Sequence, residues 1–381
     1  MTVEKAGKLF EKFSDECIRC GACQNTCALL NDLGLMPGEL AQVIFQDQIS
    51  DECLAAIQRC DLCGQCSQGC LADLNPSDLI KAAREVLIQK GRIHPEDYDV
   101  MLVDRDWNFF SIYRDTYGIR FDDLATERYE ALFFPGCTLA AYAPELTRAA
   151  FNWLQEQGLQ VGFTDLCCAK PLDSIGLAGQ ADQYLDRLRA QLSTAGAHKL
   201  ITACPNCEAH LRVVKLLEIE VCSIYSMMVE AGVGLEGSET LTFHDSCPDR
   251  YSKQNPNDVR GLLAGFPQVE MASRAENTIC CGSGGIVSMI DPDLCSARAR
   301  RRMAEFSESG ADTCVTSCMA CSQRLARVSQ PSQVRHCLEY VFNIQVDYAQ
   351  IERNTQAMWE GSQGEINTQR LWQVHVLPVR E

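Results

Sequence analysis

The spacing of the cysteine residues is the strongest constraint on what this chain can fold into. The 381 residues include 23 cysteines, of which nine lie between Cys17 and Cys70 and fourteen between Cys137 and Cys337. A chain of this length can bury cores of its own, so it has no need of a disulfide framework. Its start, MTVEKAGKLFEKF, lacks the apolar core of a secretory signal. We therefore expect a reducing, cytoplasmic setting, in which clustered thiols indicate metal binding.

Charge and hydropathy exclude two classes of partner. The net charge of −17 and the isoelectric point near 4.8 argue against nucleic acid, because no basic stripe is available to neutralise phosphates. The longest apolar runs, ALFFPGC and VLPV, fall far short of the ~20 residues that cross a bilayer. The sequence therefore predicts a globular protein with no transmembrane segment of its own.

The second block of cysteines repeats itself. Its first copy has Cys137, the pair 167–168 and CPNC at 204–207, and its second copy has Cys247, the pair 280–281 and CMAC at 318–321. Corresponding cysteines are 110 to 114 residues apart. Five positions held in step over such a distance indicate an internal duplication.

Each cysteine of the repeat follows a short run typical of a β-strand. The segments ALFFPGC, VGFTDLCC and KLITAC lead into the first copy's cysteines, and LTFHDSC and DTCVTSC lead into two of the second copy's sites. Helix-like stretches such as PELTRAAFNWLQEQG and SARARRRMAEFSESG separate them. Alternating strands and helices predict parallel sheets, with the cysteines at strand ends and helix starts.

The N-terminal cysteines form two runs of C-x2-C-x2-C-x3-C, at 17–27 and 60–70. This spacing is typical of two cubane [4Fe–4S] clusters, in which the fourth cysteine of each run binds the other cluster. The first N-terminal group is then Cys17, Cys20, Cys23 and Cys70, and the second N-terminal group is Cys60, Cys63, Cys66 and Cys27. We expect Gly21 and Gly64 to fold the backbone tightly around the clusters, as cofactor-binding positions. Zinc is the alternative, but zinc ribbons use two CxxC pairs rather than two runs of four.

The residues between and after these runs are helix-like, as in DECLAAIQRC and PSDLIKAAREVLIQK. The predicted fold class is therefore an α-helical ferredoxin domain followed by a duplicated α/β cysteine-rich domain. The predicted divisions are a ferredoxin-like domain at 1–95, a connector at 96–130, a first half-domain at 131–235, a second at 236–345 and a C-terminal tail at 346–381.

Five thiolates in each half exceed the four that a cubane needs, and two adjacent cysteines cannot readily point at one metal. The pattern C-x(~30)-CC-x(~35)-CxxC, with CCGSGG at the second pair, resembles the cysteine-rich CCG domain. With the two-cubane segment ahead of it, the chain resembles the D-type subunit of heterodisulfide reductase, in which parts similar to the separate C and B subunits are fused.

That resemblance implies two noncubane [4Fe–4S] clusters, between which a disulfide is cleaved. The first CCG set would be Cys137, Cys167, Cys168, Cys204 and Cys207, and the second CCG set would be Cys247, Cys280, Cys281, Cys318 and Cys321, all ten acting as ligands and as catalytic residues. Gly282 is the implied cofactor-binding glycine after the second pair. The first pair departs from the pattern, because Ala169 stands where the family has glycine, and we expect this to distort the turn.

The resemblance implies an oxidoreductase that works as part of a larger complex. Electrons would pass from the flavin or haem of a partner, a flavoprotein or a membrane cytochrome, through two cubanes to two noncubane clusters that reduce a small-molecule disulfide. The alternative is a pure electron relay in a glycolate- or lactate-oxidase-like or quinone-linked complex. Gly284 and Gly285 lack the frame of a nucleotide loop, so no flavin or nicotinamide is expected in this chain. The location is then cytoplasmic, or peripheral to the inner membrane through a partner.

Several other residues carry weaker predictions. His244 and Asp245 either support the second CCG set or donate a proton. Lys170 either steadies an anion or is a solvated surface residue. The basic run around Arg300 is interpreted as a solvated helix face, with a docking patch for an acidic partner as the alternative. Cys314 is close enough to Cys318 to compete as a ligand. Trp359 and Trp372 of the tail are candidates for an interface. The remaining residues, interpreted as structural, are His210, His336, Cys53, Cys222, Cys295 and Cys337.

Overall fold

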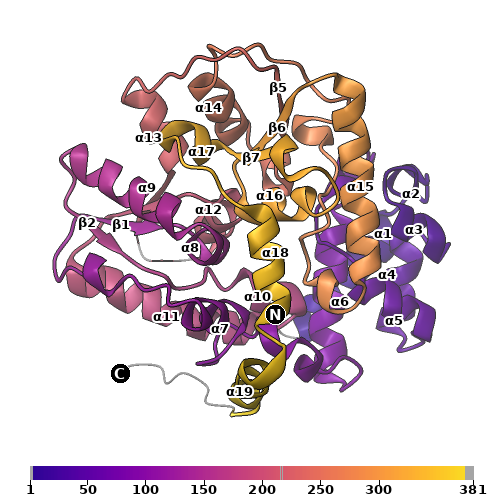
Figure 1. Ribbon diagram of the computed structural model, residues 1–381. Helices are drawn as coiled ribbons and strands as arrows, with labels where there is room; N and C mark the ends of the chain where they lie inside the picture. The colour runs from indigo at the N-terminus through magenta and orange to yellow at the C-terminus, as the bar shows by residue number, and fades with distance from the viewer. Residues whose placement is uncertain (1–2, 215, 217, 374–381) are drawn as a thin grey trace.

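The N-terminal part of the chain is built from helices. A computed structural model describes residues 3–373 except 215 and 217, and Figure 1 shows these helices gathered at one side of the molecule. They are α1 (Val3–Glu16), α2 (Ala22–Thr26), α3 (Ala28–Leu33), α4 (Pro37–Phe45), α5 (Asp51–Gln58) and α6 (Pro76–Gln89), with the 3-10 turns η1 (Gln65–Ser67) and η2 (Pro95–Met101). The helical ferredoxin-type part that the sequence predicts is therefore present.

Helix α6 shows how local sequence sets these elements. Pro76 occupies the first turn, where its missing N–H costs nothing. The side chain of Asn75 caps the helix by accepting from the backbone N–H of Ser77 at 3.2 Å. Gly91 follows the end with a φ of 66°, the left-handed conformation that glycine tolerates. Its buried residues are small or aliphatic except for two charged ones, Arg84 and Glu85.

The first half-domain contains a four-stranded parallel sheet in the order β2-β1-β3-β4. Its strands are β1 (Ala131–Phe134), β2 (Val161–Phe163), β3 (Lys199–Thr202) and β4 (Glu220–Ser223). Its helices are α8 (Cys137–Tyr142), α9 (Pro144–Glu156), α10 (Lys170–Ile175), α11 (Ala178–Ala195), α12 (Pro205–Val213) and α13 (Ile224–Glu230). The parallel pairing agrees with the alternating strand and helix pattern of the sequence.

The second half-domain repeats this plan with a three-stranded parallel sheet in the order β5-β6-β7. Its strands are β5 (Leu241–His244), β6 (Thr313–Thr316) and β7 (Val334–His336). Its other elements are η4 (Cys247–Tyr251), α14 (Gln254–Leu262), η5 (Ala275–Asn277), η6 (Val287–Met289), α15 (Pro292–Ser309), α16 (Met319–Ala326), η7 (Pro331–Gln333) and α17 (Cys337–Phe342). The counterpart of β2 is reduced to an isolated bridge between Leu241 and Gln268.

The C-terminal tail packs on the connector. The connector elements are α7 (Phe109–Thr116) and η3 (Asp122–Leu124), and the tail forms α18 (Tyr348–Ala357) and α19 (Gly361–Trp372). Tyr117 donates to the Asn354 carbonyl at 2.7 Å, and Arg370 pairs with Asp115 at 2.7 Å. Trp359 packs into the apolar cluster of α7, whereas Trp372 is 73% exposed. Trp359 therefore lies at an interface within this chain, between the tail and the connector.

Two large apolar clusters hold these parts together. One joins the N-terminal helices to the first half-domain through residues such as Leu40, Leu87 and Leu172. The other joins the two half-domains through residues such as Phe133 and Phe243. Burial of these side chains is the main driving force for the arrangement. Among the described residues, no helix has the length and apolarity needed to span a bilayer.

Candidate metal and redox centre

The two N-terminal cysteine runs adopt the same local fold. Gly21 and Gly64 both have left-handed backbones, with φ of 77° and 71°, and each directly precedes a short helix. Arg19 and Leu62, at the matching positions two residues earlier, have φ of 55° and 53°. A non-glycine residue pays about 1–2 kcal/mol in this region. The repeated use of this backbone indicates that both runs form one and the same tight loop.

The fourth cysteine of each run lies with the other run. Burial raises the pKa of Cys23, and the nearby thiols of Cys17 and Cys70 raise it further. Burial likewise raises the pKa of Cys27, which has Cys63 as its neighbour. The thiols around Cys66 are those of Cys60, Cys63, Cys27 and Cys23. Cys17, Cys20, Cys23 and Cys70 also line one small cavity. The fourth cysteine of each run therefore lies beside the other run, as the spacing suggests, and the two groups adjoin.

The first CCG set gathers at the ends of neighbouring strands. Cys137 begins α8 after β1, Cys204 caps α12 after β3, and the vicinal pair lies in the loop that follows β2. Parallel strands bring these ends to one edge of the sheet. The thiols adjoin one another in the order Cys137, Cys167, Cys168, Cys207 and Cys204.

The second CCG set is arranged in the same way. Cys247 begins η4 after β5, and Cys318 caps α16 after β6. Cys281 Sγ lies 3.2 Å from Cys321 Sγ, and the neighbouring thiols of Cys280 and Cys321 lower the pKa of Cys281. A lowered pKa favours the thiolate, which is the form that binds a metal.

The groups are joined into a single row of sulfur atoms. Cys204 of the first CCG set lies next to Cys318 of the second. At the other end of the second set, Cys247 and Cys280 both contact Cys63 of the second N-terminal group. All 23 cysteines are free thiols. Because soft thiolates gathered in groups of four and five are the donors of iron–sulfur clusters, the residues fit such cofactors.

Ala169 does not distort the first CC turn. It has a φ of 62°, and Gly282 has a φ of 86° at the equivalent position, so both turns use the left-handed conformation. Gly282 has a further restriction, because a Cβ there would collide with the carbonyl oxygen of Cys295. The expectation of a distorted turn is wrong, since alanine tolerates this conformation at a modest cost.

The loop of Cys60 and Asp61 docks directly on the second half-domain. A Cβ on Gly284 would lie 2.5 Å from the Asp61 carbonyl oxygen, and one on Gly285 would collide with the Cys60 carbonyl oxygen. The two glycines therefore permit backbone-to-backbone contact. Arg84 donates to the carbonyls of both Cys60 and Gly285, at 2.6 and 3.2 Å.

Two further arginines hold the same loop. Arg250 donates to the Cys63 carbonyl at 2.8 Å. Arg298 pairs with Asp61 at 2.7 Å, and burial raises the pKa of Asp61 to about 6 against the effect of this cation. Arg302, one helical turn after Arg298, is fully buried. The interpretation of the basic run as a solvated face is wrong for both arginines, because residues four apart share one face of α15 and that face points inward.

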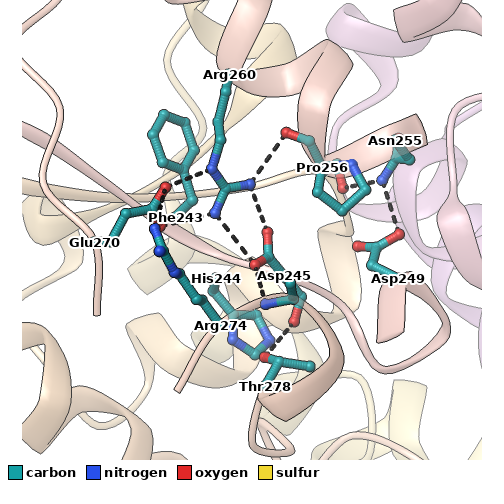
Figure 2. A network of polar contacts seen from close by, with 12 residues as sticks. Phe243, His244, Asp245, Asp249, Asn255, Pro256, Arg260, Glu270, Arg274 and Thr278 are labelled. Atoms are coloured by element: carbon teal, nitrogen blue, oxygen red, sulfur yellow. Dashed lines mark hydrogen bonds and ion pairs between the residues drawn. The ribbon is translucent and has the colours of Figure 1, made fainter. Parts of the chain in front are cut away.

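A polar network fixes the backbone that leads into the second CCG set (Figure 2). Asp245 accepts from Arg260 at 2.8 Å and from the backbone N–H of Ala275 at 2.8 Å. Arg260 also pairs with Glu270 at 2.7 Å. These donors lower the pKa of Asp245 although its burial opposes them. Asp245 is thus held as a carboxylate with a structural role, and the Thr278 hydroxyl donates to its carbonyl at 2.8 Å.

Lys170 lies beside the junction of the two CCG sets. Its ammonium donates to the Asn206 side chain at 2.9 Å, and the Asn206 amide in turn contacts Cys318 Sγ at 3.7 Å. Lys170 is only partly exposed. The solvated-surface alternative is therefore wrong, and the residue provides a positive charge at the junction.

The remaining histidines and cysteines are mostly structural. His336 caps α17 by accepting from Leu338 N–H at 3.3 Å, and burial lowers its pKa to about 4. His210 is nearer to the chemistry, because it lies close to Cys168 and 3.9 Å from Asp173. Cys314 is fully buried on β6, where burial raises its pKa to about 12 beside Arg302. The other cysteines outside the four groups are Cys53, Cys222, Cys295 and Cys337, of which three are buried and Cys222 is partly exposed.

Cavities reach the cysteine groups at several points, and a small one of about 20 Å³ is lined by Cys17, Cys20, Cys23 and Cys70 of the first N-terminal group. A cavity of about 870 Å³ runs along the second N-terminal group and is lined by Cys27, Cys63, Cys280 and Arg298 among others. A smaller one of about 130 Å³ opens on Cys137 and Cys167 of the first CCG set. Its other walls include Arg105 and Arg114 of the connector and Arg187 of α11, beside the carboxylates of Asp106 and Asp165 and some apolar side chains. The first CCG set is therefore reached from solvent through a mouth lined by arginines.

Sequence reasoning did not identify Arg84, Arg250 or Arg302 as residues of this centre. Arg84 carried a signal, because a lone arginine among alanine, valine and leucine in α6 sits at a core position. Gly284 and Gly285 were noted as a glycine pair, but their partner lies more than 200 residues away in sequence. Arg250 and Arg302 carried no signal that separates them from surface arginines.

Comparisons with known proteins agree with this organisation. Residues 13–74 match the 4Fe-4S dicluster domain, and residues 131–212 and 241–326 match the cysteine-rich domain CCG. The B subunit of the fumarate reductase (CoM/CoB) of Methanothermobacter marburgensis is 22% identical over 80% of this chain, which spans 66% of that protein, just under two thirds. The D subunit of the dihydromethanophenazine:CoB–CoM heterodisulfide reductase of Methanosarcina barkeri is 24% identical over 82% of this chain and 88% of that protein.

A relative of another kind has nearly the same length. The glycolate oxidase iron–sulfur subunit of Escherichia coli is 20% identical over 85% of this chain and 92% of that protein. The matched domains together cover more than half of this chain and contain all four cysteine groups. The chain, a 4Fe-4S dicluster domain followed by two CCG domains, therefore belongs to the CCG-domain iron–sulfur proteins that include the D subunit of heterodisulfide reductase.

Proposed function

We propose that this chain is the electron-transfer and catalytic subunit of a heterodisulfide reductase-like complex. The observation that carries the proposal is the row of sulfur atoms that runs from Cys63 through the second CCG set to the first. This row gives the cysteine groups a definite order in space. Electrons enter at the N-terminal groups, pass the second CCG set and reach the junction of the two CCG sets.

The cofactors of the proposal are two cubane and two noncubane [4Fe–4S] clusters. The two N-terminal groups, with four cysteines each, would hold the cubanes, and the two CCG sets, with five each, would hold the noncubane clusters. When bound, the clusters supply one-electron transfer and sites for sulfur. The chain's own part is to hold these thiols close together and to exclude water around them, as the burial of Cys167, Cys281 and Cys318 supports.

The disulfide would bind where the two CCG sets meet. Lys170 and Asn206 provide a cation and an amide donor at that junction, and the arginine-lined mouth leads toward the first CCG set. Such donors orient carboxylate, phosphate or sulfonate groups. The proposed substrate class is therefore a small disulfide with anionic groups. This agrees with the name of one relative, a CoB–CoM heterodisulfide reductase subunit.

The alternative is an electron relay without a substrate of its own. The similarity to the glycolate oxidase iron–sulfur subunit over 92% of that protein favours it. The presence of both complete CCG sets favours disulfide chemistry. In either case the redox partner is a flavoprotein or a membrane cytochrome, and the chain acts in the cytoplasm or at the inner membrane through that partner.

One experiment separates the two functions. The chain is prepared without oxygen, where we expect about 16 iron atoms per chain if four clusters form, and is reduced with titanium citrate that is removed afterwards. Small disulfides that carry sulfonate, phosphate or carboxylate groups should then reoxidise it and release two thiols per disulfide. The matched control is Cys281→Ser, which should abolish this reoxidation while the N-terminal clusters keep their electron paramagnetic resonance.

Two results would contradict the proposed function. A wild-type chain that no disulfide reoxidises, but that exchanges electrons rapidly with a partner protein, supports the relay. A preparation that holds only a few iron atoms per chain, or holds zinc in place of iron, removes the basis of both functions.

The entry point for electrons gives a separate prediction. Cys20 of the first N-terminal group is exposed, and beside that group Ile18 is 62% and Leu71 is 79% exposed. Exposed aliphatic side chains next to a redox site favour docking of a redox partner. The double variant Ile18→Asp/Leu71→Asp should weaken partner binding about tenfold or more, the effect of one lost hot-spot contact. Co-purification with the partner measures the binding, and the variant should still be reduced by titanium citrate. Val213→Asp, at another exposed position, is the control.

A further inference from the structure

A histidine stands behind the second CCG set with one nitrogen already engaged. His244 ends β5 and is 2% exposed. Its Nδ1 lies 3.0 Å from Nε of Arg302. A guanidinium can only donate, so Nδ1 must accept, and the proton of the neutral ring then lies on Nε2. The contact with Arg302 therefore fixes the tautomer of His244.

Arg302 is itself held in one orientation. It is fully buried on α15 and donates to the carbonyl of Ser273 at 2.7 Å and to that of Phe243 at 3.2 Å. It also pairs with Glu305 at 2.5 Å, which neutralises its charge. The guanidinium has no room to turn away from the histidine, because all these partners are satisfied at once.

The free side of the imidazole faces sulfur. A ring nitrogen of His244 and the Sγ atoms of Cys281 and Cys321 all lie within 4.8 Å of one another. Since Nδ1 accepts from Arg302, Nε2 is the nitrogen left to interact with them. Nε2 is buried and has no hydrogen-bond partner among the residues that the structure describes. A buried N–H without a partner is costly, unless a sulfur accepts it.

The first half-domain lacks this pair. Phe134 ends β1 where His244 ends β5, and Leu188 occupies the position on α11 that Arg302 has on α15. Both belong to one apolar cluster. The pair of His244 and Arg302 thus replaces two apolar residues, in a protein interior where charge is expensive. Such a replacement points to a function at the second CCG set.

We propose that His244 donates a hydrogen bond from Nε2 to sulfur of the second CCG set, with Arg302 as the positioning residue, and thereby raises the reduction potential there. The inference rests on the proposed function only in requiring a redox cluster at that set. The N–H dipole favours the added negative charge of the reduced form. The same tautomer rules out His244 as a metal ligand, because a ligating Nε2 would need a proton on Nδ1, opposite the donor Arg302.

The test compares potentials in the full, iron-loaded chain. His244→Phe, which installs the residue of the first half-domain, should lower the midpoint potential of the second CCG cluster alone, with about a tenfold fall in the ratio of reduced to oxidised cluster at a fixed potential. His244→Gln keeps an N–H donor and should restore most of the shift. The readouts are a potentiometric titration followed by electron paramagnetic resonance and the iron content, with the other three clusters as internal controls.

The double variant His244→Phe/Arg302→Leu protects the test against misfolding, because it leaves no unpaired guanidinium. It should show the same lowered potential with a full iron content. An unchanged potential in His244→Phe, or the loss of one cluster's iron from His244→Gln, would overturn the inference. If the wild-type chain shows no signal from a cluster at the second CCG set, the proposed function fails instead.

Discussion

Replacing Gly285 with alanine is expected to lower the free energy of unfolding by roughly 3 kcal/mol or more, the sum of a strained backbone and a collision. Gly285 has a φ of 61°, and a Cβ there would collide with the Cys60 carbonyl oxygen and lie 2.8 Å from Asp61 Cα. Backbone cannot move aside as a flexible side chain can, so the two segments in contact must separate. Thermal unfolding of the iron-loaded chain measures the effect.

Gly361 provides the control for this variant. It has the same φ of 61°, but a Cβ there would meet nothing within 4 Å. Gly361→Ala should therefore cost only about 1 kcal/mol, the strain of the left-handed backbone. Equal losses in the two variants would show that backbone strain accounts for the whole effect and that the Cys60 loop does not depend on close contact. In the iron-free chain, Gly285→Ala should also speed the alkylation of Cys63, and Gly361→Ala should not.

Replacing Arg84 with methionine should destabilise the chain by about 4 kcal/mol, because buried carbonyls lose their donor. Arg84 is 2% exposed and donates to five carbonyls, those of Ile57, Gln58, Cys60, Ser174 and Gly285. These carbonyls belong to the N-terminal part, the first half-domain and the second. One side chain thus ties three parts of the chain together, next to a cysteine of the second N-terminal group.

Two further variants show whether geometry or charge matters at this position. Arg84→Lys keeps the positive charge but has a single nitrogen, which cannot reach carbonyls on three sides, so most of the loss should remain. Arg92→Met changes a partly exposed arginine that follows the same helix and should cost under about 1 kcal/mol. Unfolding in denaturant compares the three. A full rescue by lysine would mean that the charge, and not the fork of donors, holds the parts together.

The local structure of this chain follows closely from its sequence. The segments ALFFPGC, VGFTDLCC, KLITAC and LTFHDSC contain β1, β2, β3 and β5. These strands were visible because buried parallel strands are short and apolar, and a cysteine of the repeat follows each of them within a few residues. The cysteine spacing likewise indicated the four groups, since ligands of one loop are set by local geometry. Both kinds of prediction depend on neighbours in sequence.

Contacts between segments that are distant in the chain could not be predicted from the sequence. Nothing in the sequence indicated that the Cys60 loop meets the second half-domain rather than the first, because each half-domain has a loop with a pair of adjacent cysteines. Gly284 and Gly285, which follow Cys281, identify the docking site of the Cys60 loop only once the contact itself is known. In the same way, Arg298 and Arg302 differ from their exposed neighbours Arg300 and Arg301 by helical phase alone, and that phase depends on how α15 packs.

The contact between Cys204 and Cys318 has a consequence for the history of the chain. These cysteines are counterparts in the two copies of the repeat, so equivalent surfaces of the two copies face each other, as they do in an isologous dimer interface. The duplicated unit thus resembles a dimer whose two copies became covalently linked. Linkage allows each copy to change separately, and only the second copy has a histidine at the end of its first strand, where the first copy has Phe134.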